Sequence, residues 1–75
     1  DGVMREDALG LDVVYIQAKK YGPDNPVGPD AVQAFAGSLL ERGATKGVFV
    51  TTSRFTSGAQ KAADRLSTQR RIVLI

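Results

Sequence analysis

The chain has 75 residues, with 10 basic and 8 acidic side chains and a net charge of +2. A chain of this length forms at most one domain and buries only roughly 60% of the surface that its unfolded form exposes. Cysteine and histidine are both absent, which excludes disulfides, thiolate or histidine zinc sites and Ser-His catalysis within the chain. The small positive charge is compatible with nucleic-acid binding but is too weak to indicate it.

The two ends of the sequence suggest a piece of a longer protein. It begins with Asp1 rather than Met, and it stops at the apolar run 72–75. We therefore interpret the chain as a fragment. It contains no signal-peptide pattern and no apolar run near the ~20 residues that cross a membrane. We expect a cytoplasmic protein without membrane contacts.

Four segments have the composition of β-strands. Residues 2–5 are short and mixed, whereas residues 11–19 form the strongest candidate because Val13, Val14, Tyr15 and Ile16 are β-branched or aromatic. Residues 47–52 and 72–75 are compact apolar runs, typical of strands that are buried on both faces. A short turn at residues 7–10 separates the first two strands, which we therefore expect to be antiparallel.

Two segments have helical periodicity. Between residues 27 and 43, apolar side chains recur on one face of a helix, at Val32, Phe35, Ala36, Leu39 and Leu40. Pro29 suits the first helical position, and Gly43 suits the position just past the end. The second helix is predicted from about Thr56, as its N-cap, to Leu66. Gly37 costs ~1 kcal/mol against Ala within the first helix, and close packing on the sheet would explain its presence.

The order of the predicted elements is β-β-α-β-α-β, with residues 20–28 as a loop rich in Gly and Pro. The last two strands each follow a helix, so we expect right-handed crossovers that make them parallel to the preceding strand. This order predicts an α/β fold in which two helices flank a mixed four-stranded sheet.

Polar residues at the end of the second predicted strand form a candidate site. Gln17 and Lys19 share one face of that strand with Val13 and Tyr15, because side chains alternate. If the hairpin turns about residue 9, Asp1 lies directly opposite Gln17, with Cβ atoms ~5 Å apart. A shift of one residue would move Asp1 to the other face of the sheet. The grouping of a carboxylate, an amide and an ammonium therefore depends on this register.

Such a group has the chemistry needed to hydrolyse a phosphodiester. Carboxylate, amide and carbonyl oxygens bind hard cations such as Mg²⁺ or Mn²⁺. The metal lowers the pKa of a bound water, and a neighbouring Lys can orient that water or neutralise charge on the phosphate. The alternative is that Asp1 is a solvated terminal residue, and that Gln17 and Lys19 are the solvent-exposed end of a strand. Spacing alone favours this alternative.

The wider sequence context resembles a known family. Asp-Gly-Val at residues 1–3, followed by a strand that ends in VYIQAKKY at residues 14–21, is similar to the catalytic domain of Mrr-type restriction endonucleases. These enzymes are a branch of the PD-(D/E)XK phosphodiesterases, and their pattern places an Asp before a Gly and then a strand ending in Gln-x-Lys. The similarity continues, in order, through residues 27–37, 44–56 and 72–75.

The resemblance implies a metal-dependent endodeoxyribonuclease that cuts double-stranded DNA with Mg²⁺ or Mn²⁺, in restriction of foreign or methylated DNA. Asp1, Gln17 and Lys19 would form its catalytic core. Asp1 and Gln17 would bind the metal, Gln17 as a neutral oxygen where most PD-(D/E)XK nucleases have Asp or Glu. Ala18 would add its backbone carbonyl, Lys19 would be the catalytic lysine, and Gln33 would support the ligands from the next helix.

The same resemblance implies that residues 1–75 are a truncated PD-(D/E)XK core, a single partial catalytic domain. The upstream helix and strand, which carry a further acidic residue in these nucleases, would be missing, as would a separate DNA-reading domain. The fragment alone is therefore not expected to contain every part that cleavage needs. A homodimer would supply two active sites for the two strands of a duplex.

Two other functions remain open from the sequence. The neutral Gln17 and the missing upstream acid would also suit a catalytically inactive DNA-binding module on the same fold. An unrelated α/β nucleotide-binding or regulatory domain is the third interpretation, and the lack of a GxGxxG motif and a P-loop argues against it. Thr51, Thr52 and Ser53 end the third predicted strand. They are interpreted as a strand end before a capped helix rather than as phosphate ligands.

Overall fold

The fold is seen in a computed structural model that describes residues 2–22 and 24–75. The elements are β1 (Gly2–Glu6), β2 (Val13–Lys19), α1 (Pro29–Arg42), β3 (Lys46–Thr51), α2 (Ser57–Leu66) and β4 (Arg71–Leu74). The predicted β-β-α-β-α-β order is confirmed. The second strand begins two residues later than predicted, since Leu11 lies in the hairpin loop and is 70% exposed.

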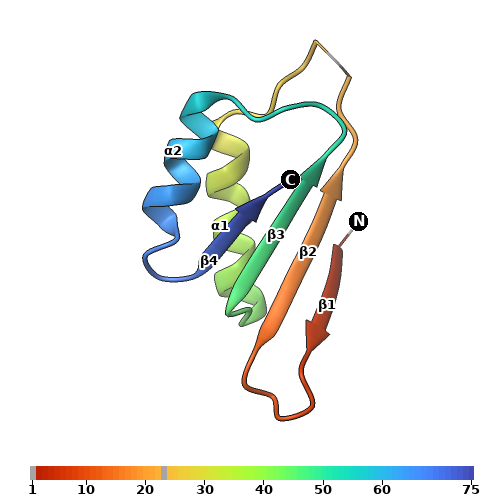
Figure 1. Ribbon diagram of the computed structural model, residues 1–75, viewed down its shortest axis with the longest axis vertical. Coiled ribbons are helices and arrows are strands. Elements are labelled where there is room, and N and C mark those ends of the chain that lie inside the picture. Colours follow the sequence, from red (N-terminus) through yellow and green to blue (C-terminus); the bar gives the residue numbers. More distant parts are fainter. Residues whose placement is uncertain (1, 23) are drawn as a thin grey trace.

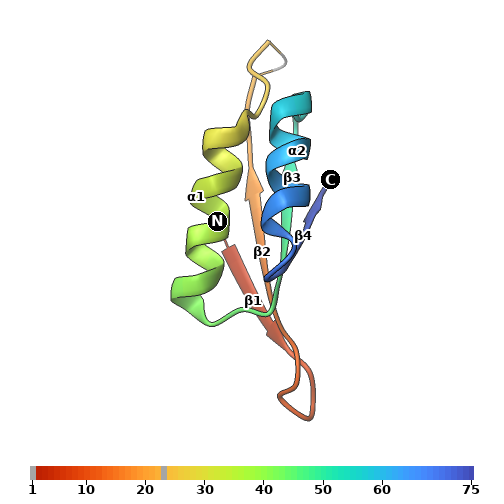
Figure 2. The ribbon, with the colours of Figure 1, turned by 90° about the vertical axis from the view of Figure 1, so that its left-hand side faces the viewer.

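The strands form one mixed sheet in the order β1-β2-β3-β4, with β1 antiparallel to β2 and the other neighbours parallel. Both helices pack side by side on the same face of this sheet (Figures 1 and 2). The described residues leave the opposite face uncovered. There, Val3, Ile16, Val48 and Val73 form one row across all four strands. The predicted α/β class and mixed sheet are confirmed, with both helices on one side.

The core lies between the helices and the sheet and is built around aromatic rings. The ring of Phe35 from α1 stacks between Tyr15 of β2, at a centroid distance of 5.9 Å, and Phe49 of β3, at 4.9 Å. All three side chains are at most 3% exposed. Because aromatic side chains bury large apolar areas, this stack fixes α1 over β2 and β3.

Helix α1 approaches the sheet most closely at Gly47 of β3, and not at its own Gly37. A Cβ atom on Gly47 would lie 2.7 Å from side-chain atoms of both Leu39 and Phe35. A Cβ atom on Gly37 would have no neighbour within 4 Å. The expectation that close packing explains Gly37 is therefore wrong, because Gly37 lies on an exposed side of α1.

The helix ends follow the predicted signals. Pro29 opens α1, and Gly43 ends it in the left-handed conformation, with φ of 67°, where its N–H donates to the carbonyls of Leu39 and Leu40. A side chain at this φ would be strained, so glycine is favoured. Thr56 is the N-cap of α2, and its Oγ1 accepts from the N–H of Ala59 at 3.0 Å.

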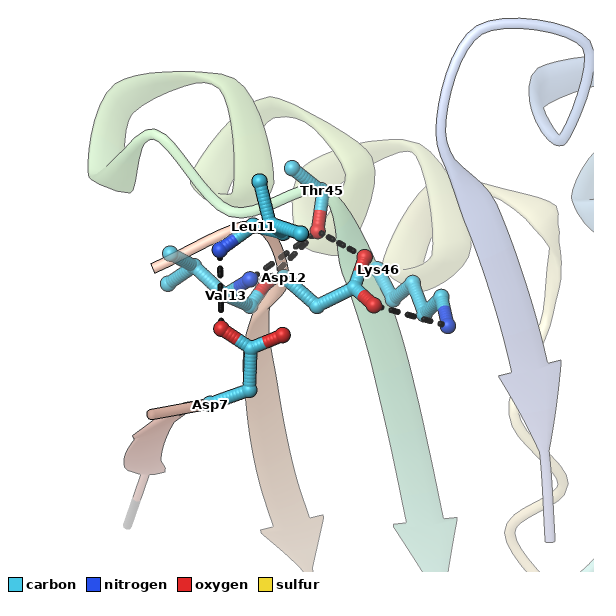
Figure 3. A network of polar contacts seen from close by, with 6 residues as sticks. All are labelled: Asp7, Leu11, Asp12, Val13, Thr45 and Lys46. Carbon is cyan, nitrogen blue, oxygen red and sulfur yellow. Dashed lines mark hydrogen bonds and ion pairs between the residues drawn. The ribbon is translucent and has the colours of Figure 1, made fainter. Parts of the chain in front are cut away.

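The register of the β1–β2 hairpin differs by one residue from the prediction. Gly2, not Asp1, lies opposite Gln17, and Met4, not Val3, lies opposite Tyr15. The cause is a loop over residues 7–12 that is stabilised by Asp7 (Figure 3). Asp7 Oδ1 accepts from Leu11 N at 2.8 Å, while Asp7 N donates to Asp12 O at 3.1 Å. The hairpin therefore turns between residues 9 and 10. Asp1 itself lies outside the described residues. The predicted register that grouped Asp1 with Gln17 is not the one observed, so the family pattern alone now supports this grouping.

Candidate active site

Gln17 and Lys19 line one pocket at the carboxyl end of β2. Alternation along the strand places them on the helix-covered face, the face of the buried Tyr15. The pocket has a volume of about 350 Å³ and receives residues from β2, β3, α1 and the loop after β2. Its other lining residues are Tyr21, Ala31, Ala34, Phe35, Ser38 and Phe49. The structure thus brings the two predicted polar residues together.

The pocket is apolar at its base and polar toward the solvent. Phe49 is paired with Gln17 across the parallel β2–β3 ladder and is only 1% exposed. Gln17 is half-buried, and Lys19, at the last position of β2, is exposed. A pocket that is lined by an amide, an exposed ammonium and aromatic rings can receive an anionic, solvated group such as a phosphate.

Tyr15 explains the glycine of the Asp-Gly pair. Gly2 lies diagonal to Tyr15 on the same face, because it pairs with Gln17 while Met4 pairs with Tyr15. A Cβ atom on Gly2 would overlap the Tyr15 ring. The ring is also covered by the guanidinium of Arg42, whose Cζ lies 4.5 Å from the ring centroid. Gly2 is therefore needed for β1 to pair with β2 beside the Tyr15 ring.

The backbone carbonyl of Ala18 points away from β3. Successive carbonyls of a strand point to opposite sides, and those of Val13 and Lys19 accept from Thr45 N and Thr52 N beside β3. The carbonyl of Ala18 must then point toward the edge occupied by β1. On that edge, the described part of β1 ends with Gly2 opposite Gln17. Ala18 therefore offers a neutral backbone oxygen at the β1 edge of β2, one residue after Gln17.

These oxygen donors fit a hard divalent cation in type. An amide oxygen and a backbone carbonyl are ligands that Mg²⁺ and Mn²⁺ accept, although neither supplies charge. Over residues 2–22 and 24–75, no group of three or more His, Cys, Asp or Glu side chains is placed to hold a metal ion. The carboxylate of the predicted site is Asp1, which the described residues do not include.

Gln33 lies in a different place from the other predicted site residues. It lines a second pocket, of about 230 Å³, on the side of α1 that faces the end of α2. Its neighbours there include Gly37, Leu40, Gln69 and Arg70. The structure does not bring Gln33 to the pocket of Gln17 and Lys19.

Ser38 is the polar pocket residue that the sequence did not reveal. It lies on α1 one and two turns from Ala34 and Ala31, and all three line the pocket with Gln17 and Lys19. The sequence signal that could have indicated this side of the pocket is the recurrence of small residues at positions 31, 34 and 38. These positions lie beside the apolar stripe of the helix. Small side chains at this spacing leave space between the helix and the end of β2.

The sequence of this chain matches one protein-family model over its whole length. The sequence model of the Mrr catalytic domain (Mrr_cat), described as restriction endonuclease, matches residues 1–75. The chain belongs to this family. The match covers the whole chain, so the Gln-x-Lys end of β2 and the pocket that it lines lie within the family's domain.

Two relatives show how this restriction endonuclease domain compares with longer proteins. The chain is 51% identical over 63 residues to the type IV methyl-directed restriction enzyme EcoKMrr of Escherichia coli (strain K12). This match covers 84% of the chain and 20% of the relative, so the chain spans about a fifth of that protein. A solved structure, the DNA modification-dependent restriction endonuclease AspBHI, matches 97% of the chain and 18% of its own length, with a TM-score of 0.66 and 21% identity. This second likeness supports the fold.

Within residues 2–22 and 24–75, neither α1 nor α2 is long and apolar enough to cross a membrane.

Proposed function

We propose that this chain is the catalytic core of a metal-dependent endodeoxyribonuclease, which hydrolyses DNA phosphodiester bonds in restriction of foreign or methylated DNA. One observation carries the proposal: in a restriction endonuclease family member, Gln17 and Lys19 line a single pocket at a strand end. The 51% identical relative is named as methyl-directed. Its name supports methylated DNA as the substrate, and we propose that this DNA is double-stranded.

Each proposed residue has a separate task. Asp1, Gln17 and the Ala18 carbonyl would hold Mg²⁺ or Mn²⁺, and the bound metal would supply Lewis acidity toward water and phosphate. Lys19 would place its ammonium beside the scissile phosphate, where it orients the attacking water and offsets the negative charge that develops as the P–O bond breaks. The stack of Phe35 and Phe49 beneath the pocket keeps bulk water away from the base of the site.

The proposal extends to the whole protein and its surroundings. Cleavage of both strands of a duplex needs two active sites or two visits, and a homodimer would supply two sites. Restriction acts on DNA within the cell, so we propose a cytoplasmic location.

The test is a comparison of two adjacent lysines in the complete natural protein that contains this chain. Lys19 lines the pocket, whereas Lys20 is exposed and does not line it. We expect Lys19→Ala to lower Mg²⁺-dependent cleavage of methylated plasmid DNA by roughly 100-fold or more, and Lys20→Ala to retain most activity. Circular dichroism would verify that both variants fold. Equal cleavage by Lys19→Ala and the wild-type protein would contradict the proposal.

A second candidate is a catalytically inactive DNA-binding module on the same fold. The neutral amide of Gln17 favours it, because a neutral ligand binds a divalent cation more weakly than a carboxylate does. This candidate predicts duplex binding that does not change when EDTA removes divalent metals, and no cleavage by the complete protein. Metal-dependent nicking that is lost in Lys19→Ala would exclude it.

A further inference from the structure

Thr52, the first residue after β3, binds the main chain at the point where β2 ends. Its Oγ1 accepts a hydrogen bond from Tyr21 N at 3.0 Å and donates one to Tyr21 O at 3.0 Å. Its own N–H donates to the carbonyl of Lys19 at 3.4 Å. Thr52, just past the end of β3, thus satisfies three main-chain groups of the segment that follows Ala18.

This segment carries two of the residues that line the candidate active site. Lys19 is the last residue of β2, and Tyr21 is the second residue of the loop that follows. Beyond Gln17, β2 has no pairing with the described part of β1, so β3 and its extension hold this end from one side. Gly22 follows at once, and glycine adds backbone freedom. The Thr52 side chain therefore restrains a backbone that has few other strand contacts.

We propose that Thr52 is a positioning residue for cleavage, because it holds the backbone of Lys19 and Tyr21 and so places the Lys19 ammonium. The proposal rests on the proposed nuclease function. Thr52 itself does not line the pocket, so it acts through Lys19. Small displacements of a reacting group lower rates strongly, and a misplacement of ~1 Å can cost roughly 100-fold.

The chain contains a matched contact at the opposite end of the same two strands. Thr45, immediately before β3, accepts from Val13 N at 3.0 Å and donates to Val13 O at 3.2 Å (Figure 3). Both threonines are exposed. The two contacts are at opposite ends of β2, roughly 25 Å apart at the rise of an extended strand. The same substitution at Thr45 therefore removes similar bonds far from the pocket.

The experiment uses the complete protein and measures single-turnover cleavage of a methylated duplex with Mg²⁺ at saturating enzyme. We expect Thr52→Val to lower the rate by roughly 100-fold, while affinity for the duplex in EDTA stays within about twofold of wild type. Thr52→Ser keeps the hydroxyl and should restore most of the rate. Thr45→Val should retain the wild-type rate, although its urea midpoint should fall as much as that of Thr52→Val.

The Lys19→Ala variant tests the proposed nuclease function, and the Thr52→Val variant tests the positioning role of Thr52. If wild type cleaves and Lys19→Ala does not, the nuclease proposal stands, and an equal rate for Thr52→Val and Thr45→Val overturns the inference alone. If wild type does not cleave, or cleaves as well with Lys19→Ala, both are overturned. Amide hydrogen exchange tests the geometry directly: Thr52→Val should speed exchange at Tyr21, and unchanged protection there would also overturn the inference.

Discussion

Gly47 and Gly37 offer a pair of identical substitutions that should change stability in opposite directions. In Gly47→Ala, the new methyl group would lie 2.7 Å from Leu39 and Phe35, which are 0% and 2% exposed. These side chains are enclosed by the core and cannot move aside freely, so overpacking should cost about 1–3 kcal/mol. The reduced entropy of the unfolded chain offsets about 0.4–1 kcal/mol of this cost. From the middle of both ranges, we expect a net loss of about 1 kcal/mol.

In Gly37→Ala, the methyl group meets no atom within 4 Å, and the helix gains the intrinsic preference of alanine. Stability should rise by up to about 1 kcal/mol. Urea unfolding followed by circular dichroism measures both free energies of unfolding, and a change of 1 kcal/mol corresponds to a shift of roughly 4–8 °C in Tm for a domain of this size. A stabilising Gly47→Ala, or a Gly37→Ala that destabilises as much, would refute the placement of α1 against β3.

Substitutions at three further positions test other parts of the structure by the same unfolding assay. Leu39→Ala should destabilise by about 2–5 kcal/mol, because this side chain of α1 is fully buried against the sheet. Thr56→Ala should cost about 1 kcal/mol through loss of the bond to Ala59 N, whereas Thr56→Ser should lose little. Asp12→Asn should change stability by less than about 1 kcal/mol, because the Asp12–Lys46 ion pair spans 3.7 Å between half-exposed side chains; a larger effect that persists in high salt would contradict this assignment.

The sequence predicted the elements well because their signals are local. The apolar period of α1, Pro29 at its start and Gly43 at its end each act within one or two helical turns. Gln17 and Lys19 were placed on one face by strand alternation alone, which the pocket confirms. The catalytic and metal-binding roles of Asp1, Gln17, Ala18 and Lys19 remain predictions, as does the supporting role of Gln33.

The register of the β1–β2 hairpin could not be predicted from local sequence signals. The sequence marks a turn between β1 and β2, but the choice between two adjacent registers depends on the Asp7 hydrogen bonds and on the room that Tyr15 needs beside Gly2. Gln33 shows the same limit. Periodicity places it on α1, but only the packing of α1 against α2 places it in a pocket away from Gln17.

The sequence by itself determined the α/β class, the order of strands and helices, the family resemblance and the polar end of β2, because each is encoded in residue types a few positions apart. Only the tertiary structure decided that Ser38 and Phe49 share a pocket with Lys19, that Gly47 rather than Gly37 marks the close contact, and that Thr52 holds the end of β2. These features join residues far apart in the chain. They depend on how the helices pack on the sheet and on how neighbouring strands pair, which residue spacing does not specify.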